Sequence, residues 1–146
     1  MSYLPCELHC HTIHSDGDFT VSELQKAAAD DHLAIIALTD HNTFSGWDEL
    51  DDNIIPAIRG IEWTTYFGHM LVLGANDFVD WRDAQPDNID EKIKQVKAVG
   101  GIVGIAHPYQ LGSPLCTGGR WEFNVRDWRN VDYIEVWHQN LYSAKR

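Results

Sequence analysis

Hydrophobic and polar positions along the chain alternate between two patterns, one typical of strands and one typical of amphipathic helices. The run at residues 33–41 is almost entirely apolar, as expected of a strand that is covered on both faces. The apolar runs at residues 53–63 and 69–75 are joined by a short connector, so they can pair as a hairpin. In all, the apolar runs predict strands at residues 3–10, 33–41, 53–63, 69–75, 102–108 and 132–138.

Two segments between these strands carry the signals of helix starts. Thr20 and Glu23 form a capping-box pattern, T-x-x-E, ahead of an apolar stripe at helical spacing. Asn88 is expected to cap a second helix, which ends at Gly100. Residues 45–50 are expected to form at most a short helix. Strands that alternate with helices predict an α/β architecture, and the chain length is that of a single domain.

Residues that could bind a metal ion gather at the ends of the predicted strands. His9 and His11 lie two residues apart on the first strand, so their side chains face the same side. In barrels of parallel strands and helices, active sites collect at the carboxyl ends of the strands. A lone buried histidine is more often a hydrogen-bonded core residue than a ligand, but the repetition favours a metal cluster. The other strand-end candidates are Asp40, His41, Glu62, His69 and His107.

Other potential ligands fit a structural role better. Cys6 and Cys10 have a zinc-ligand spacing, but no later pair of cysteines completes it, so we expect reduced thiols and a buried, apolar role for Cys10. His32 follows Asp30 by two residues at a helix end, where side chains two apart diverge. We therefore expect His32 on the surface.

Four stretches, in this order, resemble the PHP domain, named for polymerase and histidinol phosphatase: ELHCHTIHSDG, LTDHN, GIEWTT with GHMLVLG, and IAHPY. The family consists of metal-dependent phosphoesterases. The resemblance implies a distorted (β/α)7-type barrel over residues 1–146 and two to three bound divalent ions. Histidine and carboxylate ligands suit zinc, manganese or iron. It implies the following metal ligands: His9, His11, Asp16, His41, Glu62, His69 and His107.

The same resemblance divides these ligands among the ions. It implies that Glu62 bridges two ions, one held with His9 and His11 and the other with His69 and His107. Asp16 and His41 would hold part of a third ion. We leave His14, in the loop after the H-x-H, outside the ligand set.

The chain departs from the family pattern at its carboxyl end. No Asp-x-His motif follows His107, so the chain is expected to be the front and central part of the barrel, without the C-terminal strand or strands. His138 is a weaker substitute ligand on the last predicted strand. The missing segment would leave an open edge and apolar inner surface around Ile134 and Val136. We expect either a second copy of the chain to cover this edge or a longer native chain to supply the missing strand with its Asp-x-His.

The implied activity is hydrolysis of a small phosphorylated metabolite or nucleotide through a metal-bridging hydroxide. Glu62 would bridge the ions, Asp40 would support their ligands by hydrogen bonding, and Arg120 would bind the phosphate or else be a solvated loop residue. The alternative from another class is a non-catalytic or degenerate metal-binding PHP module. An amidohydrolase is disfavoured because no lysine lies on a mid-chain strand.

Charge and hydropathy limit the kinds of partner that the chain is expected to bind. The formal net charge is -11, from 22 acidic and 11 basic residues, which disfavours binding to a nucleic-acid polymer and so an exonuclease activity. No apolar run approaches the ~20 residues needed to cross a bilayer, and the first residues lack the features of a signal peptide. We therefore expect a cytoplasmic protein that does not bind membranes.

Overall fold

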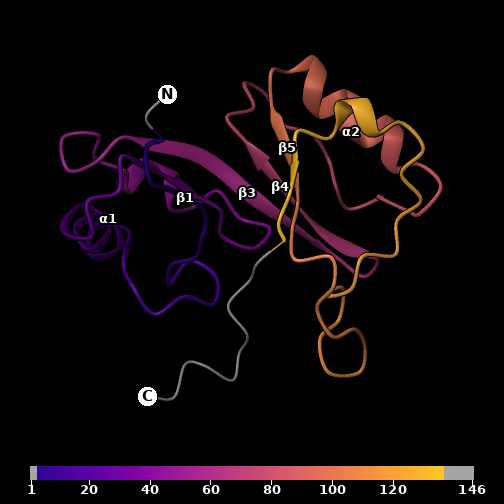
Figure 1. Cartoon of the computed structure of the whole chain (residues 1–146), viewed down its shortest axis with the longest axis horizontal. Coiled ribbons are helices and arrows are strands. Elements are labelled where there is room, and N and C mark those ends of the chain that lie inside the picture. Colours follow the sequence, from indigo (N-terminus) through magenta and orange to yellow (C-terminus); the bar gives the residue numbers. More distant parts are fainter. Residues whose placement is uncertain (1–2, 137–146) are drawn as a thin grey trace.

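The computed structural model describes residues 3–136, which form a six-stranded sheet curled into part of a barrel (Figure 1). The strands lie in the sheet in the order in which they occur in the sequence. This is the α/β fold that the sequence predicts. The strands are β1 (Cys6–Cys10), β2 (Ile35–Leu38), β3 (Ala57–Thr65), β4 (Gly68–Leu73), β5 (Ile102–Ile105) and β6 (Tyr133–Ile134).

Five strands run in the same direction and β4 runs against them. The predicted hairpin is confirmed, because β3 and β4 pair antiparallel up to Thr65 and Gly68. The start of β4, which carries His69, therefore lies at the same rim as the carboxyl ends of the other strands. β3 pairs with β2 near its beginning and with β4 from Gly60 onward, and Figure 1 shows it as the long strand that crosses the molecule.

Helix α1 (Val21–Asp30) begins with the predicted capping box. The Glu23 amide donates to Thr20 Oγ1 at 3.3 Å, and the Thr20 amide donates to Glu23 Oε2 at 2.9 Å. The helix covers the outer face of β1 and β2, where Cys10 and Ile36 pack in one apolar cluster with its alanines. A capped and packed α1 fixes the position of the loop that leads into it from β1.

Helix α2 (Ile89–Ala98) packs on the outer face of β3 and β4 with its predicted apolar side. Asn88 is the N-cap residue, as predicted, but its side chain makes no hydrogen bond to the first turn. It instead accepts from the Gln85 amide at 2.8 Å and donates to the Asp83 carbonyl at 2.9 Å. Two 3₁₀ helices, η1 (Trp47–Glu49) and η2 (Trp128–Asn130), complete the helical elements of the described residues.

The observed strands are shorter than the apolar runs that predict them. The last run, 132–138, contains a strand only at Tyr133–Ile134, and residues from 137 onward lie outside the described part. The inner face of β6 also differs from the prediction. Tyr133, not Ile134, joins the inner apolar cluster with Leu71 and Leu73, while Ile134 lines a cavity on the outer side with Ile105. The inner-facing positions of this segment are thus Tyr133 and Glu135.

Candidate metal centre

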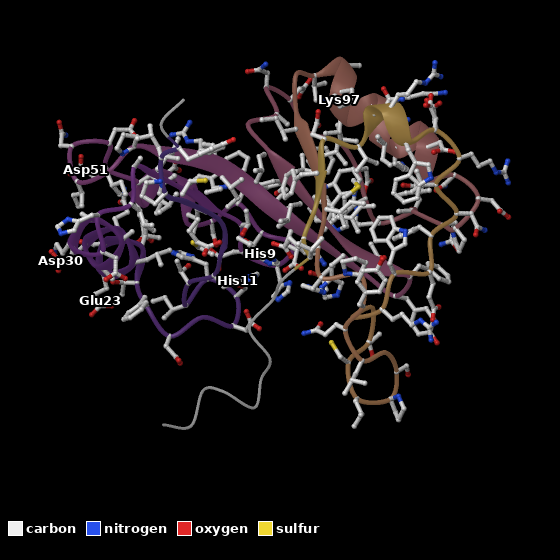
Figure 2. All side chains as sticks on the ribbon, in the orientation of Figure 1. His9, His11, Glu23, Asp30, Asp51 and Lys97 are labelled. Atoms are coloured by element: carbon white, nitrogen blue, oxygen red, sulfur yellow. The ribbon has the colours of Figure 1, made fainter. Side chains whose placement is uncertain are left out.

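The rim at the carboxyl ends of the strands brings together all seven metal-binding candidates that the sequence indicates. His9 lies near the end of β1, His41 follows β2, Glu62 lies within β3, and His107 follows β5. Figure 2 shows His9 and His11 in the middle of the molecule, whereas the labelled Glu23, Asp30 and Asp51 lie at its periphery. The antiparallel direction of β4 places His69 beside the others, as the hairpin requires.

The carboxylate of Glu62 is the centre of this cluster. Its side chain is 0% exposed, and imidazole nitrogens approach both of its oxygens. Two histidines lie at 2.9 and 3.1 Å from Oε1, and three lie at 2.8, 3.2 and 3.3 Å from Oε2. In the order of these distances they are His69, His107, His41, His9 and His11.

The potential ligand atoms form three groups, in each of which all atoms lie within 4.8 Å of one another. Glu62 belongs to two groups, as expected of a bridging carboxylate. The histidines are paired differently from the expectation, since His9 shares a group with His107, and His69 shares one with His41. The third group contains Asp16, as the expected third ion requires. The three groups are His9–Glu62–His107, His41–Glu62–His69 and His11–Asp16–His41.

The charges of these groups are strongly coupled. Burial alone would raise the pKa of Glu62, but the surrounding imidazoles hold it far below its ordinary value. Burial opposes the charge of His9 too, but the hydrogen bond to Glu135 and the nearby carboxylate of Glu62 raise its pKa to about 10. Burial dominates at His11 and lowers its pKa to about 4. Glu62 is thus an ionised carboxylate in a ring of imidazoles.

Two buried ligand-type atoms, Glu62 Oε2 and His69 Nε2, have no partner in hydrogen-bonding geometry among the described residues. Imidazole nitrogens do lie close to Oε2, but proximity without alignment leaves its lone pairs free for another partner. Buried polar atoms in folded proteins almost always have such a partner. Carboxylate oxygens and imidazole nitrogens are also the atoms that zinc, manganese and iron prefer. The residues of this rim therefore fit a cluster of divalent transition-metal ions.

Asp40 supports the cluster through hydrogen bonds to the loop that follows β1. Its carboxylate accepts from the Thr12 amide at 2.7 Å, from Thr12 Oγ1 at 2.8 Å and from Ser15 Oγ at 2.6 Å. Ser15 Oγ in turn lies 3.5 Å from His11 Nδ1. Asp40 and Thr12 are buried, so these bonds fix the backbone between His11 and Asp16.

Asp16 and His14 lie at the outer side of this loop. The Asp16 side chain is 69% exposed, and its carboxylate lies 3.7 Å from His11 Nδ1 and 3.5 Å from His41 Nε2. The His14 ring is bound to Ser45 Oγ at 2.8 Å and to Glu49 Oε1 at 2.9 Å. His14 therefore lies outside the cluster, as expected.

The long loop after β5 returns to the site at two glycines. His107 Nδ1 lies 3.4 Å from the carbonyl oxygen of Gly119, and a Cβ at Gly118 would come within 3.0 Å of His69 Nε2. Gly118 has φ +73°, and its Cβ would overlap the Thr65 carbonyl, so no larger residue fits there. Arg120, the residue after Gly119, is exposed. It lines a cavity of about 230 Å³ together with Pro108 and Trp121.

Glu135 is a site residue whose role the sequence does not reveal. His9 Nδ1 donates to its Oε1 at 2.8 Å, and the His107 amide donates to its Oε2 at 2.9 Å. Burial opposes the charge, yet the bond from His9 lowers the pKa of Glu135 below its ordinary value. The apolar pattern indicates only that Glu135 lies on the last strand. The substitute ligand expected there was His138, which lies outside the described residues.

The remaining candidates have structural positions. All three cysteines are free thiols and Cys10 is buried, as predicted. His32 is exposed, also as predicted. None of the helices within residues 3–136 has the length and apolar character needed to span a membrane.

The chain belongs to the PHP domain family, whose family model matches residues 7–103. This confirms the resemblance, and the match contains the first three of its four motifs. The matched region contains most of β1, all of β2 to β4, the first half of β5 and six of the seven candidate ligands. His107 and Glu135 lie beyond it.

Relatives of known sequence agree with this assignment. The uncharacterized protein MJ1295 of Methanocaldococcus jannaschii is 28% identical over 109 residues, which cover 75% of this chain and 48% of the relative. The uncharacterized protein MJ1587 of the same organism is 29% identical over 153 aligned positions, with 94% of this chain and 85% of the relative covered. The chain thus spans about half the length of the first relative and most of the second.

A crystal structure from Bacteroides vulgatus shows the same fold. It is a two-domain protein that contains a predicted PHP-like metal-dependent phosphoesterase, and it superposes with a TM-score of 0.69 at 22% identity. The match covers 91% of this chain and 44% of that chain. The curled sheet of this protein is therefore the strand arrangement of a PHP-like barrel.

Proposed function

We propose that this chain is a metal-dependent phosphoesterase that hydrolyses a small phosphorylated metabolite or nucleotide. The carboxylate of Glu62 carries the proposal, because it is fully buried and imidazole nitrogens of five histidines lie within 3.3 Å of it. A core hydrogen bond would account for one such contact, but not for five around one carboxylate. Membership of the PHP family and the similarity to a predicted phosphoesterase support the same reaction class.

Two to three divalent ions of zinc, manganese or iron would be held by the seven candidate ligands, with Glu62 shared between two of them. When bound, such ions supply the Lewis acidity that ester hydrolysis needs, since they lower the pKa of water and neutralise phosphate charge. Asp40 keeps the loop between His11 and Asp16 in place. Arg120, whose neighbour Gly119 contacts His107, is the cation best placed to bind a phosphate.

The charge of the chain favours a small substrate. A net charge of -11 disfavours a polymer with many phosphates.

Hydrolysis of 4-nitrophenyl phosphate by the purified chain tests the proposal. Turnover should vanish in a chelator, return with zinc, manganese or iron, and be absent from the Glu62→Gln variant. Hydrolysis that persists in chelator would contradict the mechanism. The second candidate is a non-catalytic or degenerate metal-binding PHP module. Stoichiometric metal with no turnover of any compound in a panel of phosphorylated metabolites would favour it.

A further inference from the structure

Glu135 contacts two of the candidate metal ligands from the segment after β6, whose described residues include no candidate ligand. It follows β6 directly, and its side chain points to the inner face of the sheet, where one oxygen accepts from His9 and the other from the His107 amide. Its side chain is 14% exposed, and that of His9 is 6% exposed. These are the contacts of a built carboxylate site rather than of a solvated surface acid.

The contact joins the two edges of the sheet. β1 and β6 are the first and last strands in the sheet order, and no described backbone pair connects them. The bond between His9 and Glu135 links residues that are 126 positions apart in the sequence. It therefore holds the curled sheet closed at the rim where the candidate ligands meet.

The geometry also fixes which nitrogen of His9 can bind a metal. A carboxylate can only accept hydrogen bonds, so His9 Nδ1 carries the hydrogen that faces Glu135. Nε2 then points to Glu62 Oε2, which lies 3.2 Å away. The other oxygen of Glu135 holds the backbone of His107, whose φ is +29°. Such a positive value is unusual for a residue other than glycine and needs support from its surroundings.

We propose that Glu135 is a positioning residue of the metal centre, which orients the His9 ring and fixes the His107 backbone so that both present a nitrogen to the ion beside Glu62. This rests on the proposed metal centre. Carboxylates that accept the second N–H of a ligand histidine typically contribute about 10–100-fold to metal affinity. Glu135 would do so while bridging β1, β5 and β6.

Zinc affinity, measured by competition with a chromophoric chelator, tests the proposal. We expect Glu135→Ala to weaken binding by about 10–100-fold. Glu135→Gln should lie between Ala and wild type, because His9 and the His107 amide bind different oxygens and glutamine replaces one of these by a donor. Asp132→Ala and Asp132→Asn are matched controls, since Asp132 flanks the same strand and accepts from the Val103 amide of β5 at 2.7 Å but contacts no histidine of the described part of the chain.

The controls should lower the melting temperature and leave zinc affinity within about twofold of wild type. A loss of affinity in the Asp132 variants equal to that in the Glu135 variants would reduce Glu135 to a structural role and overturn the proposal. Unchanged affinity in both Glu135 variants would overturn it too. A wild-type chain that binds no zinc would instead refute the proposed metal centre itself, and the role of Glu135 with it.

Nuclear magnetic resonance supplies a readout that a purely structural role would not move. In the zinc-loaded protein, long-range ¹H–¹⁵N spectra should show a slowly exchanging hydrogen on His9 Nδ1. This signal should persist in the Asp132 variants, and in Glu135→Ala it should disappear through exchange with water. A protected Nδ1 hydrogen in Glu135→Ala would show that another group orients His9.

Discussion

Replacing Glu62 by glutamine distinguishes a bridged metal centre from a cluster of hydrogen-bonded histidines. Glutamine keeps the shape of the side chain and one oxygen, but it removes the charge and one of the two ligand oxygens. Glu62 belongs to two of the three groups of potential ligands, and Asp16 belongs to one. Asp16→Asn is therefore a matched carboxylate-to-amide control at the exposed side of the same cluster.

The expected size of the effect follows from linkage. An ion present at 100 times its Kd stabilises the native protein by about 2.7 kcal/mol. For a domain of this length each kcal/mol raises Tm by about 3 °C, so each ion should add about 8 °C. Two ions on Glu62 should add about 16 °C in the wild type. Glu62→Gln should lose most of this increase, whereas Asp16→Asn should keep at least half of it.

The assay is thermal unfolding of each protein with and without zinc or manganese, combined with elemental analysis after gel filtration. The reasoning predicts parallel losses of bound metal and of the Tm increase in Glu62→Gln. A Glu62→Gln variant with the full metal-dependent increase would refute the bridging role. Equal losses in Glu62→Gln and Asp16→Asn would refute it as well, because the two carboxylates would then contribute alike.

Three further predictions address the loop, the sheet edge and pH. Arg120→Ala should lower kcat/KM by about tenfold or more through a higher KM, because a charge-assisted bond to phosphate is lost. The variant should keep its bound metal, and a loss of metal would contradict this role of Arg120. The bonds of Asp132 to Lys97 and the Val103 amide outweigh burial and lower the pKa of Asp132. Its stabilisation, about 1 kcal/mol or less at this partly exposed site, is therefore present above its ordinary pKa and is lost as pH falls below that value. Asp132→Asn should flatten the dependence of unfolding free energy on pH below about 4, and an unchanged slope would refute the pairing. At the edge of β6, Ile134 is 41% and Val136 is 88% exposed. A second copy should cover this edge, so light scattering should give more than the 16.6 kDa of one chain, and a monomer would contradict this expectation.

The fold could be predicted largely because its signals are local. The capping box at Thr20 depends on two residues three apart, and both of its hydrogen bonds form. Apolar runs located all six strands, and a short connector identified the hairpin of β3 and β4. The run at residues 53–63 likewise placed Glu62 on a strand, although the strand continues past it to Thr65. Asn88 occupies the predicted N-cap position, but its side chain makes no capping bond because it binds the Gln85 amide and the Asp83 carbonyl instead.

The finer arrangement of the metal centre could not be predicted, because it depends on contacts between distant segments. Asp40 bonds to Thr12 across 28 residues, and His9 bonds to Glu135 across 126. No periodicity or spacing encodes how tightly a sheet curls, and the curl decides whether Glu135 reaches β1. The grouping of His9 with His107 has the same origin, since it depends on how closely the two edges of the sheet approach each other.

Anomalous X-ray scattering from crystals grown with zinc or manganese would test the central claim most directly. If Glu62 bridges a metal centre, the map should show two peaks in contact with its carboxylate, each also in contact with histidine nitrogens of the cluster. The absence of any peak at Glu62, or a single peak that touches only Asp16 and its neighbours, would contradict the claim.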